Sequence, residues 1–418
     1  MKISNDKKMK LTKEIYRQLF APFSGLIWLL AFFVFFPYML KFSIDHLNSI
    51  LIFFSLLLGL LLISEIFFRI AYKIKYQRHY LIPPRIPFEK FFIEPHPYIP
   101  YTNKRNFTIS GGRADYDLHK GIFFFGEYQT NNYGFSNGID GGRDVIVPKP
   151  NGIIRVNCIG ASTTGNYIEH EGISYSYPIE LENILNSESD YPVEVNNFGQ
   201  GGYNSADLVV RFMLQIVDTL PDIVIIYHAY NDIRAYLTPG FEPDYSHARY
   251  NLAETYWKFS LASKVPLTPF GLINFLIGRL LPIDHRNVLL DQVSKGSIDE
   301  SMDSSKGLET YKRNLQYIID ICKSRGIQVI LSTYCHFLHN SIKAEPLSQL
   351  YGKIVTEENK VMRSLATKND LFLVDNASVV PQDEKYFVDS IHFTPLGMKL
   401  IAKNFASAVL DHLSKKRR

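Results

Sequence analysis

The residues that could do chemistry together in this chain of 418 residues lie in four short segments. The first is GASTTGN at 160–166, which directly follows an apolar run and contains Ser162. A serine at a strand-to-helix junction can act as a nucleophile when a base removes its proton. Serine and threonine also commonly cap helices, so this segment alone is a weak indication of catalysis.

Two other motifs compete for the same segment, and each lacks an essential residue. Gly160 and Gly165 have the spacing of a P-loop, but Asn166 occupies the place of the phosphate-binding lysine. In the nucleophile elbow G-x-S-x-G of α/β-hydrolases, Thr164 occupies the place of the second glycine. Neither motif therefore explains the segment.

The second and third segments contain groups that could stabilise a developing oxyanion. NFGQGGYNS at 197–205 includes Gly202, and glycines let backbone N–H groups approach a ligand closely. As a dinucleotide fingerprint this segment lacks the third glycine. HAYND at 228–232 contains Asn231, whose side-chain amide can donate to an oxyanion. Taken singly, a tight turn with a helix cap and an Asx turn are the simpler interpretations of these two segments.

The fourth segment, DSIH at 389–392, combines a carboxylate with an imidazole. Asp389, three residues before His392, can orient the ring, fix its tautomer and stabilise the imidazolium. A single D-x-x-H is commonplace, so this pair gains meaning only together with the other three segments.

The elements around these segments predict a parallel sheet with helices on both faces. Strands are expected from the apolar runs at 153–159, 193–198, 222–227, 327–333 and 371–374, and helices from the spacing at 205–220, 308–324, 357–367 and 395–413. Such an alternation is the order of a doubly wound α/β domain. In these sheets ligands bind at the carboxyl ends of the strands, where three of the four segments lie.

In order and spacing, the four segments resemble the SGNH hydrolases, also called the GDSL esterase/lipase family. The resemblance covers the whole α/β region and implies a flavodoxin-like three-layer sandwich. It implies that Ser162 is the nucleophile and that Asp389 and His392 complete a catalytic triad. It also implies an oxyanion hole formed by the backbone N–H groups of Ser162 and Gly202 and by the side chain of Asn231.

Two residues depart from the family pattern without removing catalytic chemistry. Ala161 replaces the aspartate of G-D-S, and Ala229 replaces the glycine of G-x-N-D. These changes weaken the assignment to a subfamily more than they affect the expected activity.

The reaction implied by the resemblance is acyl transfer through an acyl-serine, with no cofactor and no metal. With water as acceptor the protein is an esterase, for example for O-acetyl groups on a sugar or polysaccharide. With a sugar hydroxyl as acceptor it is an O-acyltransferase, and lipase and thioesterase activities are further alternatives. A silent membrane-anchored scaffold is the non-enzymatic alternative, and the complete set of five site residues argues against it.

The first 85 residues predict a membrane hairpin. The apolar runs at 19–40 and 49–68 are each long enough to cross a hydrocarbon core that needs about 20 helical residues. Lysine and arginine gather before the first run and after the second, and Lys41 is the only basic residue between them. Positive flanks stay in the cytoplasm, so a multi-pass protein with a cytoplasmic catalytic domain is expected. That domain would lie outside if only one of the runs crossed.

The rest of the chain divides by composition and charge. The segment at 86–150 is rich in proline and glycine and is expected to be a linker or accessory segment. The hydrolase domain is expected at 151–418, with a proline-rich insertion at about 236–305. The first 85 residues carry a formal charge of +8 and the remainder −4, which together give the +4 of the whole chain. The positive charge therefore indicates membrane topology and gives no reason to expect nucleic-acid binding.

The cysteines and two spaced histidines add no site of their own. Cys158, Cys322 and Cys335 form no C-x-x-C pair, which suits a reducing compartment and predicts neither a disulfide framework nor a zinc site. His336 and His339 are three residues apart, but no third ligand accompanies them.

Overall fold

The computed structural model describes most of the chain after residue 140 and parts of the region before it. The described residues are 47–76, 93–94, 96–109, 128–138, 141–165, 168–170, 173–248, 271–273, 276, 298–338 and 346–416. The chain divides into two compact units, one of Met1–Ile82 with Leu267–Leu276 and the other of Pro83–Pro266 with Ile277–Arg418.

A five-stranded parallel sheet forms the centre of the second unit. Its strands are β5 (Ile154–Gly160), β8 (Val193–Gly199), β9 (Ile223–Tyr227), β10 (Gln328–Ser332) and β11 (Phe372–Val374). They are arranged in the order β11-β10-β9-β5-β8, and all neighbours are parallel. The chain winds outward in both directions from β5, so the carboxyl ends of β5 and β9 flank a topological switch point. The doubly wound fold expected from the sequence is confirmed.

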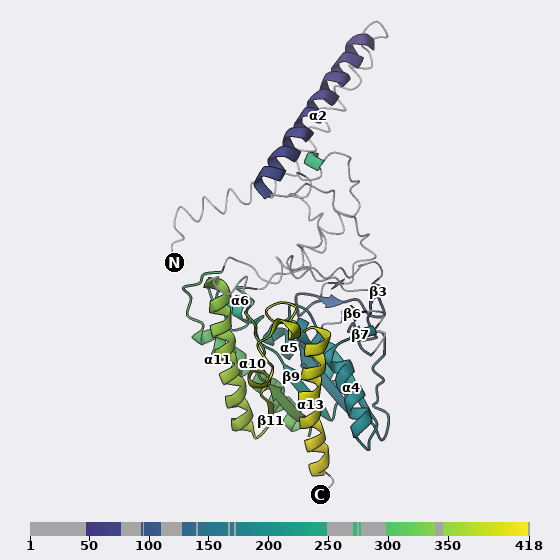
Figure 1. Cartoon of the computed structure of the whole chain (residues 1–418), viewed down its shortest axis with the longest axis vertical. Coiled ribbons are helices and arrows are strands. Elements are labelled where there is room, and N and C mark those ends of the chain that lie inside the picture. Colours follow the sequence, from purple (N-terminus) through teal and green to yellow (C-terminus); the bar gives the residue numbers. More distant parts are fainter. Residues whose placement is uncertain are drawn as a thin grey trace. The chain divides into compact units, whose positions relative to one another are not determined.

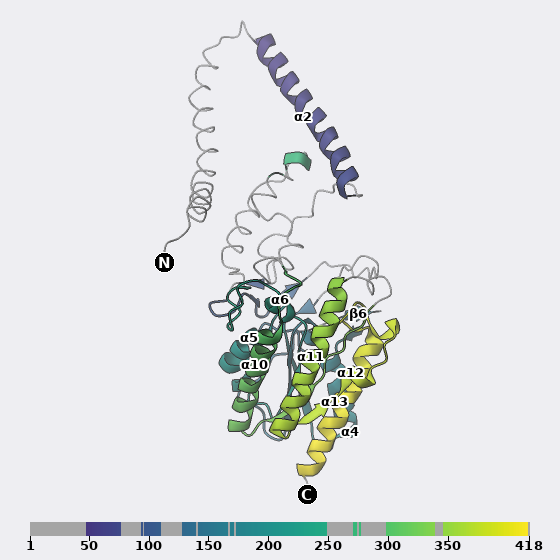
Figure 2. The same ribbon diagram turned by 90° about the vertical axis from the view of Figure 1, so that its left-hand side faces the viewer.

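Helices cover both faces of this sheet (Figure 1). On one face α4 (Tyr177–Glu188) packs against α13 (Pro395–Lys416). On the other, α10 (Ser305–Ser324) packs against α5 (Ser205–Arg211) and α11 (Pro346–Asn369). Figure 2 shows α10 and α11, which connect parallel strands, running in the same general direction, as such crossovers require. The core between these layers is apolar, because each helix turns an apolar stripe toward the buried strands.

Helices α5 and α11 differ most in length from the expectation. The helix expected over 205–220 ends as α5 at Arg211, and a π-helical turn (Phe212–Ile216) and a 3₁₀ turn (Val217–Thr219) follow it. These turns keep Phe212, Ile216 and Val217 buried, although the helical spacing changes. Helix α11 begins at Pro346, well before the expected 357, because proline is favourable in the first turn of a helix.

The segment before the sheet contains two small antiparallel strand pairs. Strand β1 (Ile93–Glu94) pairs with β2 (Thr102–Asn103), and β3 (Thr108–Ile109) pairs with β4 (Tyr128–Gln129), both antiparallel. A further small pair, β6 (Ile168–His170) and β7 (Ile173–Tyr175), follows β5. Apolar side chains of the early segment, among them Tyr101 and Phe135, belong to the same buried core as the sheet.

The first unit contains helix α2 (Leu47–Tyr76), which includes the apolar stretch Leu51–Ile74 with a mean hydropathy of 2.5. By length and composition this stretch could cross a membrane, and most of its large apolar side chains are exposed. The expected span at 49–68 lies within this helix, and Arg69 pairs with Glu65 one turn earlier at 2.7 Å. The run at 19–40 lies outside the described residues. The described part of the chain therefore shows one candidate span, and the two-helix hairpin stays a prediction.

The insertion expected at 236–305 is described only in part. Its two ends meet in the second unit, where the N–H of Asp299 donates to the carbonyl of Leu237 at 2.8 Å. A middle portion belongs to the first unit, where the Glu65 carboxylate accepts the N–H groups of Gly271 (2.7 Å) and Leu272 (2.8 Å). Part of the insertion thus belongs to the unit with the sheet and part to the unit with the apolar helix.

Candidate active site

Ser162 is the first residue of the short helix α3 (Ser162–Gly165), directly after β5. Its side chain is half-buried at the carboxyl edge of the sheet. A side chain at Gly160 would bring a Cβ within 2.3 Å of the Tyr227 carbonyl oxygen and of Thr164 Oγ1. Only glycine therefore fits between the ends of β5 and β9. The short distance between these strand ends determines where the turn with Ser162 begins.

His392 connects Ser162 with Asp389. Its Nε2 is 2.8 Å from Ser162 Oγ, and its Nδ1 is 2.8 Å from Asp389 Oδ2. With the proton on Nδ1 facing the carboxylate, Nε2 is an acceptor for the serine hydroxyl. The other carboxylate oxygen of Asp389 accepts the N–H groups of Ile391 and His392, both at 2.8 Å. We call Ser162, His392 and Asp389 the accessible trio, since all three are partly exposed.

The surroundings of Asp389 favour its ionised form. Burial by itself would raise the pKa, but the neighbouring His392 ring and the hydrogen bonds from His392 and Ile391 outweigh it. The pKa of the Asp389 carboxyl is therefore below its ordinary value. An ionised carboxylate at this place stabilises an imidazolium that forms when His392 accepts a proton.

The two segments with possible oxyanion donors lie beside Ser162. A Cβ on Gly201 would be 3.9 Å from Ser162 Cβ, so the glycine turn after β8 borders the serine. Gly202 has a φ of 78°, in the left-handed region that favours glycine. Asn231 Nδ2 donates to the carbonyl of Tyr203 at 2.8 Å, which ties the turn after β9 to the turn after β8. An amide nitrogen carries two hydrogens, and this bond uses one of them.

The structure thus brings together all five residues that the sequence singled out. Ser162, Gly202 and Asn231 follow three neighbouring strands, and Asp389 with His392 comes from the loop before α13. Their arrangement has the connections that an acyl-transfer site needs, namely a hydroxyl, a base, a carboxylate and nearby N–H donors.

A second set of the same residue types lies nearby and was not expected. Asp232 accepts the Ser205 N–H at 2.9 Å and the Ser205 hydroxyl, and it is 2.8 Å from His228 Nε2. The Tyr245 hydroxyl also donates to it at 2.9 Å. Ser205, His228 and Asp232, which we call the buried trio, are wholly inaccessible to solvent. They join the start of α5 to the turn that carries Asn231, so their role is structural.

Glu358 on α11 supports the same turn from the other side. Its carboxylate is buried and lies 3.0 Å from both the Tyr230 N–H and the Tyr236 hydroxyl. Burial, with a smaller contribution from Asp232, raises the pKa of Glu358 to about 8. Tyr230 has a φ of 66°, an unfavourable conformation for a tyrosine, and its N–H is held by Glu358. A carboxylate among the buried apolar positions of α11 is the one sequence signal that could have identified this residue.

The spaced histidines and the cysteines give no further site. His336 is half-buried beside Tyr230, with 6.0 Å between the ring centroids, and burial lowers its pKa to about 4. His339 lies outside the described residues. Within the described part of the chain no three metal-ligating side chains gather, and the three cysteines are free and buried.

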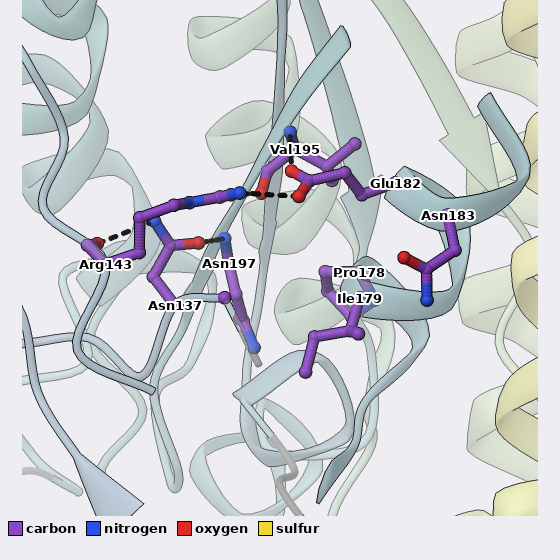
Figure 3. Close-up of a pocket in the computed structure, with 9 residues that line it drawn as sticks. Asn137, Arg143, Pro178, Ile179, Glu182, Asn183, Val195 and Asn197 are labelled. Carbon is purple, nitrogen blue, oxygen red and sulfur yellow. Dashed lines mark hydrogen bonds and ion pairs between the residues drawn. The ribbon is translucent and has the colours of Figure 1, made fainter. Parts of the chain in front are cut away.

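A small pocket lies away from these residues, between Asn137, Gly138 and Arg143 on one side and α4 and strand β8 on the other (Figure 3). There Arg143 contacts Glu182 Oε1 at 2.5 Å and the Val195 carbonyl at 2.6 Å, and the Glu182 side chain accepts the Val195 N–H at 2.6 Å. Asn137 Nδ2 donates to the Arg143 carbonyl at 3.0 Å. These bonds fasten the loop to an edge strand, and none of the five site residues lines the pocket.

Three solved structures are similar to part of this chain at low sequence identity. A lipase/acylhydrolase from Enterococcus faecalis is 17% identical with a TM-score of 0.38, and the match covers 61% of this chain and 94% of that one. An acetyl xylan esterase, AlAXEase, is 17% identical with a TM-score of 0.38, covering 61% of this chain and 100% of that one. The acetylxylan esterase Axe2 from Geobacillus stearothermophilus is 15% identical with a TM-score of 0.38, covering 61% and 94%.

Family membership rests on a family model and not on these distant structures. None of the curated proteins matches the chain. The model of the GDSL-like lipase/acylhydrolase family matches residues 158–400, more than half of the chain, and this range includes all five site residues. The chain therefore belongs to the GDSL-like lipase/acylhydrolase family.

Proposed function

We propose that the protein is a membrane-anchored serine esterase that cleaves an acyl ester through an acyl-serine intermediate. The observation that carries the proposal is the unbroken chain from Asp389 through His392 to Ser162, with 2.8 Å at each step, at the edge of the sheet where Gly202 and Asn231 also lie. Each of these groups has a distinct task in acyl transfer.

In the first half of the proposed reaction, Ser162 Oγ attacks the ester carbonyl while His392 Nε2 takes the hydroxyl proton. The carbonyl π electrons move to the oxygen, and the N–H groups of Ser162 and Gly202 and the Asn231 amide stabilise this oxyanion. When the tetrahedral intermediate collapses, the alcohol leaves with the proton from His392. Asp389 holds the ring and stays ionised throughout.

In the second half, water attacks the acyl-serine and gives its proton to His392. Collapse of the second intermediate releases the acid and returns the proton to Ser162. If a sugar hydroxyl replaces water, the same steps transfer the acyl group to that sugar. The choice between hydrolysis and transfer therefore depends on what reaches the acyl-enzyme, and not on the trio.

For the substrate, we propose an O-acetyl ester on a sugar or polysaccharide. Polysaccharide O-acetyl esterases are one of the groups to which the four sequence segments bear a resemblance. Lipids and thioesters are the competing substrates, and acetyl and long-acyl p-nitrophenyl esters distinguish a short-chain esterase from a lipase.

For the anchor, we propose that both α2 and the run at 19–40 cross the membrane and that the unit with the sheet lies in the cytoplasm. The exposed apolar surface of α2 and the basic flanks support this topology. Protease treatment of intact and opened membrane vesicles tests it. Digestion of the sheet-containing domain in intact, right-side-out vesicles would overturn the cytoplasmic placement.

The test of the enzymatic proposal uses the full-length protein in detergent with p-nitrophenyl acetate and an acetylated oligosaccharide. Wild type should release acetate, and Ser162→Ala should remove that activity while the unfolding temperature stays the same. The matched control is Ser187→Ala, since Ser187 is exposed on α4 and lies outside the five site residues. A wild-type protein that hydrolyses no ester, or a Ser162→Ala variant that keeps full activity, would refute the proposal.

A further inference from the structure

The glycine turn after β8 is held by residues that lie outside the range matched by the family model. The Tyr101 hydroxyl donates to the carbonyl oxygen of Gly201, and the Tyr203 hydroxyl donates to the Tyr101 carbonyl at 2.7 Å. Gln200 Nε2 donates to Asn103 Oδ1 at 2.9 Å. These bonds form a clasp between residues 101–103 and residues 200–203, whereas the family model begins at residue 158.

The side chains of the clasp are buried and packed against one another. The side chains of Tyr101, Asn103, Gln200 and Tyr203 are all buried, so a missing partner would leave a desolvated polar group. The rings of Tyr101 and Tyr203 meet edge to face with 5.7 Å between centroids. Burial raises the pKa of Tyr101, so its hydroxyl keeps its proton and remains a donor.

A second layer holds the outer half of the clasp. Arg211 at the end of α5 donates to Thr102 Oγ1 at 2.8 Å and to the Tyr133 carbonyl at 3.1 Å. Its guanidinium lies 4.5 Å from the centroid of the Phe135 ring. Residues 101–103 are therefore fixed to the sheet unit and can act as a support.

The Gly201 carbonyl and the Gly202 N–H belong to one planar peptide group. A hydrogen bond to that carbonyl therefore sets the direction in which the Gly202 N–H points. It also polarises the peptide group, which makes the N–H a stronger donor. A turn with glycines at 199, 201 and 202 has much backbone freedom to lose, so it needs such an external support to be preorganised.

We propose that Tyr101 is a positioning residue for the oxyanion hole, whose hydroxyl holds the Gly201–Gly202 peptide group and aims the Gly202 N–H at the acyl oxygen. This inference rests on the proposed esterase function. It follows that the working catalytic unit includes the segment between the apolar helix and the family-matched domain, and that a chain starting at residue 151 would lack part of its oxyanion support.

The test compares Tyr101→Phe with Tyr98→Phe in the full-length protein. Each variant loses one phenolic oxygen from the same segment, but Tyr98 is 67% exposed and lies outside the clasp. Loss of a whole oxyanion donor costs about 10²–10³-fold in kcat, so a donor that is only misaligned should cost about 10-fold. We expect Tyr101→Phe to lower kcat by about that factor with KM unchanged, and Tyr98→Phe to match wild type.

Affinity for a boronic acid gives a readout that a merely structural role would not move. The tetrahedral boronate on Ser162 places an oxygen where the oxyanion forms, so Tyr101→Phe should weaken boronate binding by the same factor as kcat. Wild-type kcat and wild-type boronate affinity in a folded Tyr101→Phe variant would overturn the inference. If Tyr101→Phe does not fold, Tyr203→Phe replaces it in the test, because this variant removes the bond to the Tyr101 carbonyl. Tyr203→Phe should show the same loss of kcat with KM unchanged. A wild-type kcat in Tyr203→Phe would overturn the inference.

Failure of this inference is distinguishable from failure of the proposed function. If wild type hydrolyses no ester and binds no boronate, the esterase proposal fails. If wild type is active and the clasp variants are equally active, the esterase proposal stands and only the role of Tyr101 fails.

Discussion

The accessible trio and the buried trio contain the same three residue types but differ in which residue is central. In the accessible trio the histidine lies between serine and aspartate, so a proton can pass from the serine to the ring. In the buried trio the aspartate is central, and both the serine and the histidine contact it. The serine hydroxyl there donates to a carboxylate and has no imidazole base. The order of the hydrogen bonds and the access to solvent, more than the residue types, distinguish a site for chemistry from a structural network.

The two trios are also linked. Asp232 of the buried trio is adjacent to Asn231, and Ser205 opens the helix that follows the glycine turn. The buried trio therefore holds the two turns with the proposed oxyanion donors, while Glu358 and Tyr101 hold the same turns from other directions. The molecule uses inaccessible polar groups to fix the backbone around the accessible ones.

The largest difference is expected between the two histidines. His392→Ala should lower kcat on the order of 10⁶-fold, because the serine loses its base, and should leave the unfolding temperature unchanged. His228→Ala should lower the free energy of unfolding by about 1–3 kcal/mol, because it removes one of the hydrogen-bond partners of the buried Asp232, and should keep most of kcat per folded molecule. Initial rates with thermal unfolding of each variant measure both quantities. Equal losses of kcat would mean that the trios are not functionally distinct.

The two aspartates should differ in the same sense, with a smaller effect. Asp389→Asn should lower kcat by about 10⁴-fold, because the amide no longer favours the tautomer with an acceptor at Nε2. Asp232→Asn should act on stability, since it exchanges a carboxylate with several donors for an amide with one acceptor oxygen. Steady-state kinetics beside urea unfolding would separate the two. A stability loss in Asp389→Asn larger than in Asp232→Asn would contradict the comparison.

The smallest expected effect is that of Glu358 on stability, and the direction of its pH dependence can be checked. Its pKa is raised from 4.5 to about 8 in the folded protein, so between these values the folded state binds a proton that the unfolded state has lost. The contribution of Glu358 to stability should therefore be fully present below about pH 4.5 and be lost as the pH rises toward 8. Glu358→Gln should remove this decline, as measured by urea unfolding from pH 5 to 8.5. If the decline in stability persists unchanged in Glu358→Gln, another group causes it and the prediction is wrong.

The sequence predicted the parts of the fold and site that depend on local patterns. The strands that end at Gly160, Gly199 and Tyr227 follow from apolar runs, and the five site residues stand in segments of recognisable order. The supports could not be predicted in this way. Tyr101 reaches a residue one hundred positions later, and Glu358 reaches one 128 positions earlier, so only the folded chain shows these contacts.

The lengths of helices were likewise decided by tertiary packing and end chemistry. Helix α11 begins at a proline earlier than expected, and α5 ends early in wider and tighter turns that keep the core residues buried. The division of the insertion between two units has no local signal in the sequence either. Local periodicity indicates where an element lies, but the neighbours of an element decide where it stops.

The most direct test of the central claim is to label the full-length protein with a fluorophosphonate and locate the adduct by peptide mass spectrometry. The accessible trio predicts a single adduct on Ser162, formed at a rate that falls in His392→Ala, and no adduct on Ser205. An active protein whose adduct lies on another serine, or an active protein with no adduct, would contradict the assignment of Ser162 as the nucleophile.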